Sequence, residues 1–568
     1  MVTPHELFLS AALAIVPRIL TLTCRTPSMR GYGSCDREWW NTAQRTMSLP
    51  RRQEAVLSLA LAYTLPGQPY YGREDLPAII AATLDFWCGL QHRDGAFDDL
   101  YANERAHVAA AFGTYAVAET LESMRDRLMQ HASWPRWLDS VRRACKWLCT
   151  HSDTTVANHQ IGACAALQAA SVVLRDAHWS STAANLMHDV LRLQSREGWF
   201  PEYGGADTGY LSLSLGYLAK YHQRGGLEPV IPAARSACAF LARLIMPDGS
   251  CGGEYCCRNT SYLLAHGPAV FAGSCPEAAQ VLATIARSYL TGTAVKPAYY
   301  DDHNCMGYGY DMWLAARETR GMKDIAVTSI ADEDEYVWRA EEAGIVVVRT
   351  PTGKVVINCR KGGAYVYGTS HHRWENAGVV VDLGNGRFMT SCSPAITAPV
   401  SGESNVASVP DDVALATTRV VVPLVYAKQN LLTPFKALAL MTVSVVLGWL
   451  PWCAERVKAV LRRLVVTPHR DSGYILRREI LCWRDGRLTV RDRLTLPPHW
   501  RRVVVAPLAD NRYGETSRCS SDTALPAPLV LDRADFPCAT ELAVVIVVSV
   551  EGEVSIEARP DGGSRERI

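Results

Sequence analysis

The sequence predicts a protein of two domains, an N-terminal (α/α) incomplete toroid followed by an antiparallel β-sandwich. Three observations carry this prediction: the length of 568 residues, a helical pattern up to about residue 320, and short β-branched runs beyond it. A single hydrophobic core stops growing at roughly 250 to 300 residues, so a chain of this length needs more than one. We expect the toroid over residues 1–325 and the sandwich over residues 326–568.

The helical region consists of amphipathic segments separated by short turns that contain Gly, Pro or Asp. Strand-like alternation is nearly absent between residues 50 and 320. The clearest expected helices are 76–90, 105–121, 137–148, 159–174, 182–193, 210–221 and 232–244.

A repeat of about 51 residues is visible in the turns that follow three of these helices. The turns read Gln-His-Arg-Asp-Gly-Ala-Phe from residue 91, Gln-Ser-Arg-Glu-Gly-Trp-Phe from 194 and Ile-Met-Pro-Asp-Gly-Ser-Cys from 245. Their starts differ by 103 and 51 residues (194 − 91; 245 − 194), which is two periods and one. Two antiparallel helices fill one period, and stacked helical hairpins form a solenoid that can curl into a toroid. With these turns at one end, we expect the loops of that rim to carry the functional site.

The β-sandwich is predicted from β-branched runs bounded by turn signals such as Thr352-Gly353 and Asp485-Gly486. Expected strands lie within 343–349, 354–360, 377–387, 474–483 and 487–494. This spacing is typical of a predominantly antiparallel sandwich. Residues 559–568 are rich in Gly and charge, and we expect them to fray.

A segment at about 430–466 fits neither domain, because residues 437–454 are uncharged and mostly apolar while several basic residues follow. A single membrane span here would place the two halves of the sandwich on opposite sides of a bilayer, which is physically implausible. We expect a helical insertion that either packs on the protein or makes peripheral membrane contact through residues 437–466, with 457–466 as a basic amphipathic partner.

Composition excludes several classes of function. The 58 Lys and Arg nearly cancel the 57 Asp and Glu, so no global field attracts nucleic acid, and a polyanion would have to be bound locally. The 18 cysteines form no C-x-x-C pair, which favours buried free thiols over zinc or redox motifs. The apolar run 8–16 lacks a basic segment before it, so we predict no signal peptide and favour a cytoplasmic or membrane-associated location over a periplasmic or secreted one.

The pair Asn158-His159, followed 51 residues later by Tyr210 (210 − 159), is the most informative motif. A neutral amide beside an imidazole, with a phenol from a separate segment, can remove a weakly acidic proton from the carbon next to a carboxylate. That chemistry indicates a uronic acid as the substrate.

These motifs are followed by Gly-Thr-Ser-His-His-Arg-Trp-Glu-Asn-Ala-Gly at residues 368–378, where the sandwich begins. In order and spacing, over most of the chain, the combination resembles the heparinase II/III and alginate lyase group of polysaccharide lyases. The resemblance implies a toroid plus a β-sandwich, and cleavage of a uronate-containing polysaccharide by β-elimination.

The resemblance and the chemistry together give roles to Asn158, His159, Tyr210, His372 and Arg258. Asn158 and His372 would donate hydrogen bonds to the uronate carboxylate and stabilise the enolate-like transition state. His159 or Tyr210 would remove the C5 proton, and Tyr210 would protonate the leaving oxygen. Arg258 would lower the pKa of the phenol or hold a substrate acid. Further substrate-binding candidates, which could stack on sugar rings or bind their hydroxyls, are Trp199, Glu202, Tyr203, Asp207, Asn259, Tyr262, Tyr308, Tyr310 and His371.

The sequence departs from the family pattern at two places. Some relatives have Arg or Glu three residues after the histidine of the Asn-His pair, where this chain has Gly162, so that role would fall to Gln160 or Arg258. Some relatives hold a structural zinc in the sandwich, but Trp374 and Asn376 stand where ligands would be expected. We therefore predict no metal and no other cofactor.

Two other functions stay open from the sequence. A uronyl C5-epimerase begins with the same proton abstraction and returns a proton on the opposite face, and the apolar insertion favours it. An (α/α) glycoside hydrolase would need two carboxylates about 5 to 9.5 Å apart, which the sequence gives no reason to pair, and a glycan-binding scaffold would need none. The polymer, its sulfation and the oligomeric state are not determined by the sequence.

Overall fold

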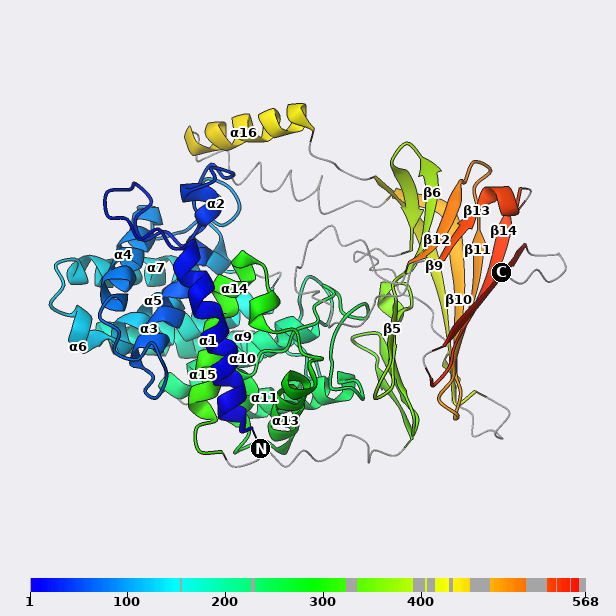
Figure 1. Cartoon of the computed structure of the whole chain (residues 1–568), viewed down its shortest axis with the longest axis horizontal. Coiled ribbons are helices and arrows are strands. Elements are labelled where there is room, and N and C mark those ends of the chain that lie inside the picture. Colours follow the sequence, from blue (N-terminus) through cyan, green and yellow to red (C-terminus); the bar gives the residue numbers. More distant parts are fainter. Residues whose placement is uncertain are drawn as a thin grey trace.

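Helices and strands occupy separate parts of this computed structural model, which describes residues 2–153, 156–225, 230–322, 335–391, 404–405, 414–428, 433–449, 470–506, 529–537, 539–551 and 553–560. The helices of the first part end at Glu318 and the strands begin at Tyr336. Figure 1 shows the helical part beside two sheets. The expected boundary at residues 325 and 326 lies outside the described residues.

The helical part is built of antiparallel pairs with one helix in an outer layer and one in an inner layer. Outer helices are α4 (Leu76–Leu90), α7 (Trp134–Thr150), α9 (Ala177–Leu191), α11 (Val230–Leu244) and α13 (Pro276–Thr291). Inner helices are α3 (Ala55–Thr64), α5 (His107–Ser123), α8 (Ala157–Leu174), α10 (Thr208–Gly225), α12 (His266–Phe271) and α15 (Tyr310–Glu318). Short helices between them are α2 (Arg37–Trp40), η1 (Pro50–Glu54), α6 (Arg125–Leu128), η2 (Pro297–Tyr299) and α14 (Asp302–Tyr308).

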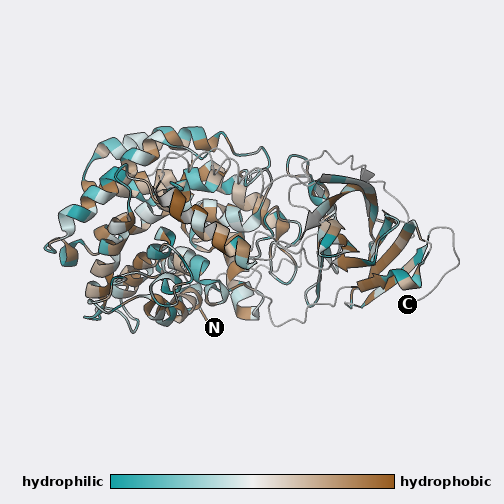
Figure 2. Cartoon of the chain, turned by 90° about the horizontal axis from the view of Figure 1, so that it is seen from above, coloured by the Kyte–Doolittle hydropathy of each residue, from teal (hydrophilic) through white to brown (hydrophobic). Residues whose placement is uncertain are grey.

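The inner helices close into a ring, because each packs on the next and α15 returns onto α3. They are buried on all sides: every residue of α10 from Thr208 to Tyr221 is buried, whereas α9 in the outer layer buries four. Figure 2 shows the same division, with hydrophobic residues concentrated in the central helices. An all-apolar helix belongs inside a protein and an amphipathic one at its edge, so this burial follows from the sequence pattern.

The turns of the 51-residue repeat lie at one end of the ring and have a common geometry. Gly95 and Gly198 have φ of +99° and +104°, and a Cβ on either would lie 2.2 Å from a backbone oxygen of the next outer helix, Arg143 or Ser236. The side chain of Gln91 or Gln194 donates to the carbonyl of the glycine in its own turn. Glycine is required because only it combines this backbone conformation with this close approach.

Helix α1 (Pro4–Leu22) is an element that the sequence analysis does not assign. Thr3 and Glu6 form a capping box at its start, and its apolar face, which includes Phe8 and Ile15, is buried against α15. By length and composition α1 is the one helix among the described residues that could cross a membrane, but the core helix of a water-soluble protein meets the same criteria.

The β-part contains two antiparallel sheets. The first sheet is a meander of β1 (Tyr336–Ala340), β2 (Ile345–Arg349), β3 (Lys354–Asn358), β4 (Ala364–Gly368) and β5 (Arg373–Asn376). The second has the order β13-β12-β6-β7-β9-β10-β11-β14-β15, with β8 paired to β9. Its strands are β6 (Gly378–Gly384), β7 (Arg387–Thr390), β8 (Ser404–Asn405), β9 (Ala416–Lys428), β10 (Arg470–Cys482), β11 (Leu488–Thr495), β12 (Arg502–Ala506), β13 (Leu529–Asp532), β14 (Glu541–Val548) and β15 (Val554–Pro560).

The first sheet is buried on both faces. Ile345 and Val347 of β2 belong to the helical core, while the alternate residues Val346 and Val348 pack with the second sheet. Since neighbouring side chains of a strand point to opposite faces, an uninterrupted apolar run is what a strand between two layers requires. The β-sandwich therefore docks on the helical ring through this sheet.

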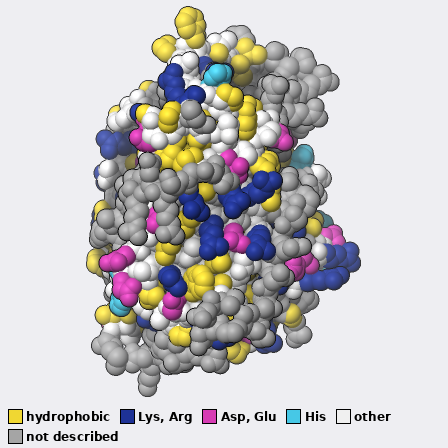
Figure 3. Space-filling view, turned by 90° about the vertical axis from the view of Figure 1, so that its right-hand side faces the viewer, with side chains coloured by type: hydrophobic (Ala, Val, Ile, Leu, Met, Phe, Trp, Pro, Cys, Tyr) yellow, Lys and Arg dark blue, Asp and Glu magenta, His cyan; other side chains and the backbone are white. Residues whose placement is uncertain are grey.

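The second sheet has one buried and one solvent-exposed face. On the exposed face Arg419, Glu479 and Arg491 of adjacent strands form a row of ion pairs. Figure 3 looks onto this end of the molecule, where basic and acidic side chains are interspersed rather than gathered into one sign. Toward the first sheet, the buried Arg478 forms a bidentate ion pair with Asp492.

The predicted insertion connects β9 to β10 and contains helix α16 (Pro434–Trp449). Figure 1 shows α16 apart from both sheets. The expected basic partner at residues 457–466 lies outside the described residues. Of residues 559–568, which the sequence predicts to fray, Arg559 and Pro560 are instead paired with β14 at the end of β15, and 561–568 lie outside the described residues.

Candidate active site

The inner helices α5, α8 and α10 begin at the end of the ring that faces the sandwich, the same end at which the Asp-Gly and Glu-Gly turns lie. Helix N-termini carry unpaired N–H groups and partial positive charge, which favour an anionic ligand. The predicted residues Asn158, His159 and Tyr210 all lie in the first turns of α8 and α10, which pack against each other.

Asn158 is held by Glu202. The backbone N–H of Asn158 donates to Glu202 Oε1 at 3.1 Å, and its side-chain Nδ2 donates to Oε2 at 2.7 Å. Burial raises the pKa of Glu202 well above its ordinary value, against the lowering effect of the bonds from Asn158. Glu202 is fully buried, so it orients the Asn158 amide rather than meeting solvent.

His159 is paired with Asp153, which the sequence analysis does not single out. The distance between His159 Nδ1 and Asp153 Oδ2 is 2.9 Å, and both side chains keep a small exposed fraction. A carboxylate at Nδ1 fixes the proton there and leaves the lone pair on Nε2. Burial lowers the pKa of His159, while Asp153 acts in the opposite direction. A neutral imidazole with a directed Nε2 lone pair is suited to act as a general base.

Asp207 connects the start of α10 with the loop that carries Arg258. Asp207 Oδ1 accepts from the backbone N–H of Tyr210 at 3.2 Å and from the hydroxyl of Thr260, and Oδ2 accepts from the backbone N–H of Arg258 at 2.9 Å. Asp207 is 2% exposed. Its contacts therefore position Tyr210 and Arg258 relative to each other.

The Arg258 loop brings a cation against an exposed aromatic ring of the turn that precedes α10. The guanidinium carbon of Arg258 lies 4.4 Å from the ring centre of Tyr203, whose side chain is half exposed. The same loop is held from the sandwich by the buried Lys361, whose Nζ donates to the carbonyls of Glu254 and Cys256 at 2.8 and 2.7 Å and to the side chain of Asn259. The second domain thus fixes part of the site.

A second group of charged residues, absent from the sequence analysis, lies next to His159. Arg51 on η1 donates to Glu54 at 2.9 Å and to His303 Nε2 at 3.2 Å, and its guanidinium lies 5.2 Å from the ring centre of Phe112. The ring of His159 meets the same Phe112 edge-on at 5.9 Å. Burial and the Arg51 charge lower the pKa of His303 to about 4, so its ring is neutral.

No sequence signal connects these residues, because they come from four separate segments. Burial lowers the pKa of both His159 and His303, and the carboxylate of Asp99 acts against this lowering in both. Asp153 alone had a local signal, since it lies six residues before His159 in a polar turn.

Several predicted substrate-binding residues are placed deeper. The rings of Tyr262 and Tyr308 meet at a tilt, with 5.9 Å between their centres, and the hydroxyl of Tyr310 lies 3.0 Å from that of Tyr217. All three of Tyr262, Tyr308 and Tyr310 are at most 5% exposed. Trp199 donates from Nε1 to Glu197 in the rim turn, where Glu197 binds the start of the sandwich. Their contact with a substrate stays a prediction.

His371 and His372 lie in the turn before β5, and both are exposed. Their backbone N–H groups both donate to Thr369 Oγ1. None of the contacts described for them joins them to Asn158, His159 or Tyr210, so their role at this site stays a prediction.

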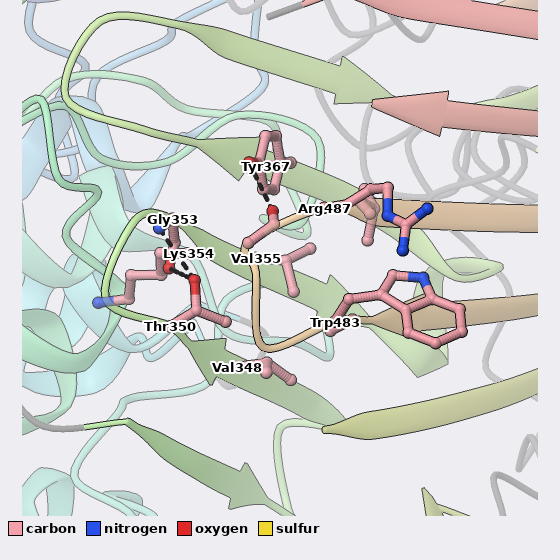
Figure 4. Close-up of a pocket in the computed structure, with 11 residues that line it drawn as sticks. Val348, Thr350, Gly353, Lys354, Val355, Tyr367, Trp483 and Arg487 are labelled. Atoms are coloured by element: carbon pink, nitrogen blue, oxygen red, sulfur yellow. Dashed lines mark hydrogen bonds between the residues drawn. The ribbon is translucent and has the colours of Figure 1, made fainter. Parts of the chain in front are cut away.

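A shallow pocket elsewhere lies at a seam between the sheets (Figure 4). Its walls come from β2, β3, β4 and the turn at Trp483–Arg487, where Tyr367 donates to the carbonyl of Gly486 at 2.7 Å. It holds none of the predicted site residues. Among the described residues, His, Cys, Asp and Glu form no group of three that could hold a metal. The 14 described cysteines are free thiols, as predicted for them.

Comparison with known proteins finds similarity in sequence for the helical part and in fold for most of the chain. Residues 44–294 match the model of the ulvan lyase N-terminal domain. The structure of a Streptomyces coelicolor A3 chondroitin AC lyase, in complex with chondroitin sulphate, is similar over 88% of this chain and 68% of its own, with a TM-score of 0.54 and 13% identity. A Paenibacillus xanthan lyase matches over 88% and 46% (TM-score 0.48, 12% identity), and heparinase III over 80% and 64% (TM-score 0.45, 10% identity). No curated protein matches the chain.

The likeness to chondroitin AC lyase is one of fold. Over most of this chain, the helical domain and the sheets have the same arrangement in both proteins. The family match concerns the sequence of the helical domain, which contains Asn158, His159, Tyr210 and Arg258. The helical part of this chain is therefore similar in sequence to the ulvan lyase N-terminal domain, and the chain as a whole shares the α/α-toroid and β-sheet fold of chondroitin AC lyase.

Proposed function

We propose that the protein cleaves a uronate-containing polysaccharide by β-elimination. The observation that carries this proposal is the Asp153–His159 pair, which fixes the tautomer of a neutral imidazole on α8, the helix that also carries Asn158 and packs against α10. The Streptomyces chondroitin AC lyase of the same fold has chondroitin sulphate bound, which supports an anionic polysaccharide as the substrate class.

The uronate carboxylate must be neutralised before its neighbouring carbon can lose a proton. Asn158 Nδ2 carries two hydrogens, of which Glu202 accepts one, and the second is the donor that we assign to the substrate carboxylate. The cation of Arg258 and the positive ends of α8 and α10 favour the same negative charge. These donors act most strongly on the enolate-like transition state, in which charge on the carboxylate is greatest.

The elimination then needs one base and one acid. His159 Nε2 takes the C5 proton, the electron pair of that C–H bond forms the C4–C5 double bond, and the bond from C4 to the glycosidic oxygen breaks. Tyr210 gives its phenolic proton to the leaving oxygen and regains one from solvent or from His159. The products are a saccharide with a new hydroxyl and one with an unsaturated uronate.

The ultraviolet absorbance of that conjugated double bond tests the proposal. We expect absorbance to rise when the protein is incubated with one member of a panel of uronate polymers. The rate of this rise should be about 1,000-fold or more lower for Tyr210→Phe. Tyr71→Phe is the matched control, since Tyr71 is an exposed tyrosine outside the site. Equal rates for wild type and Tyr210→Phe would reject the role of the phenol.

Two other outcomes would replace β-elimination by another reaction. Solvent deuterium entering C5 without absorbance would show epimerisation, and new reducing ends without absorbance would show hydrolysis. Either result would leave the fold assignment intact and overturn the proposed reaction.

A further inference from the structure

Helix α16 exposes large apolar side chains along its described length. Phe435, Leu438 and Met441 are 87, 63 and 57% exposed, and Val443, Val445 and Val446 are each more than 40% exposed. Phe435, Leu438, Met441 and Val445 follow one another at spacings of three or four residues, so they share one face of the helix. Val446 adjoins this face, whereas Val443 projects from another side of the helix.

Water is an unfavourable surrounding for such a helix. Soluble proteins rarely leave a contiguous apolar patch of this kind uncovered unless it binds something, and helices that are apolar nearly all round are found in cores or in membranes. Packing of this helix on the rest of the protein is the alternative that the sequence allows. The structure contradicts this packing for the described residues. From Pro434 to Val446 every described side chain is exposed except that of Ala437, which is partly buried.

The sheet topology limits how α16 can meet a membrane. The strands on either side of the insertion, β9 and β10, are antiparallel neighbours, with Tyr426 paired to Arg470. The insertion therefore leaves and re-enters the sheet at one place, so both of its ends lie on the same side of a bilayer. One crossing is excluded by this pairing, and an element that enters one leaflet is compatible with it.

The charge of the flanking sequence indicates which lipid surface fits. Lys436 precedes the uncharged run 437–454, and Glu455, Arg456, Lys458, Arg462 and Arg463 follow it, which gives five positive charges against one negative. The whole chain has a net charge of only +1, so this excess is local. Basic residues beside an apolar helix are attracted to anionic lipid headgroups.

We propose that α16 is a membrane anchor, which lies in the boundary between headgroups and acyl chains of an anionic bilayer with its Phe435–Leu438–Met441–Val445 face toward the lipid. The anchor holds the protein on one side of the membrane without crossing it. Catalysis at the helical ring is not required for this binding.

Sedimentation with lipid vesicles tests the anchor directly. We expect the full chain to sediment with vesicles that contain phosphatidylglycerol and to remain mostly in solution with pure phosphatidylcholine. The variant in which Leu438, Met441 and Val445 are all replaced by Glu should bind at least about tenfold more weakly. Leu290→Glu is the control, because Leu290 is 55% exposed on the outer helix α13.

Three outcomes would overturn the proposal. Failure of the wild-type chain to bind phosphatidylglycerol vesicles would do so irrespective of how any variant folds. Equal binding of the triple variant would exclude α16 as the anchor. A stable dimer in light scattering without lipid, lost in the triple variant, would show that a second copy of the chain covers the helix instead.

Discussion

Asp153 holds the ring of His159 through a hydrogen bond of 2.9 Å between Oδ2 and Nδ1. Gln160, the next residue, donates to the backbone carbonyl of Asp153 at 2.7 Å, so the first turn of α8 fixes the position of this carboxylate. The pair gives the His159 ring one tautomer and one direction, which a proton transfer from a bound sugar requires.

Replacement of Asp153 by Asn should therefore reduce turnover and shift its pH dependence. Asp153 raises the pKa of His159 against the effect of burial, so its loss lowers that pKa further. Since only the neutral ring can accept a proton, the acidic limb of the rate profile should move to lower pH, while the plateau falls by about 100-fold or more. Steady-state rates measured across the pH range give both the position of the acidic limb and the height of the plateau. Asp189→Asn, at an exposed carboxylate, should change neither, and an unmoved limb in Asp153→Asn would contradict the pairing.

Lys361 should affect activity from the second domain. Replacement of Lys361 by Met removes the donor that fixes the Arg258 loop, so kcat/KM should fall by about 10- to 100-fold. Lys354→Met is the matched control, because Lys354 is a buried lysine that bonds the carbonyl of Ile245 in the rim turn instead. Both variants should lower the melting temperature. A similar kcat/KM for the two would show that the Arg258 loop does not need Lys361.

His107 should make the protein less stable in acid. Burial lowers its pKa from 6.5 to about 4 in the folded state, so the unfolded chain binds more protons between these values. The contribution of this group to stability is complete above pH 6.5 and is lost as the pH falls to about 4, by about 3 kcal/mol in total. Urea unfolding of His107→Gln at several pH values should show a shallower loss over this window. If the free energy of unfolding depended on pH equally in His107→Gln and in the wild type, the burial of a neutral His107 ring would be contradicted.

Gly198→Ala should destabilise the rim by about 3 kcal/mol or more, because the new Cβ would lie 2.2 Å from the Ser236 carbonyl oxygen. Gly67→Ala provides the control: its φ of +87° is also left-handed, but no atom lies within 4 Å of a Cβ there. That variant should cost about 1 kcal/mol, from the backbone alone. If both variants lost the same free energy of unfolding in denaturant, the backbone of α11 would not lie as close to Gly198 as the structure has it.

The helices could be predicted well because burial and periodicity agree locally. The expected helix 76–90 has the bounds of α4, and the expected helix 159–174 ends with α8 at Leu174. Helix α1 was not assigned, because its short apolar run was weighed only as a signal peptide, whereas its burial depends on α15, about 300 residues away.

The sequence by itself determined the two kinds of domain, the common end of the turns, and the Asn158, His159 and Tyr210 motif, because these follow from local spacing and residue chemistry. Tertiary structure decided the partners that orient them: Glu202 for Asn158, Asp153 for His159 and Asp207 for Tyr210. It also placed Lys361 against the loop beside them. It also decided that Arg51 and His303 meet beside His159. The Asp153–His159 and Asp207–Tyr210 contacts are local, but the others join segments that lie tens to hundreds of residues apart. Only the closure of the ring and the docking of the sheet bring those segments within hydrogen-bond distance.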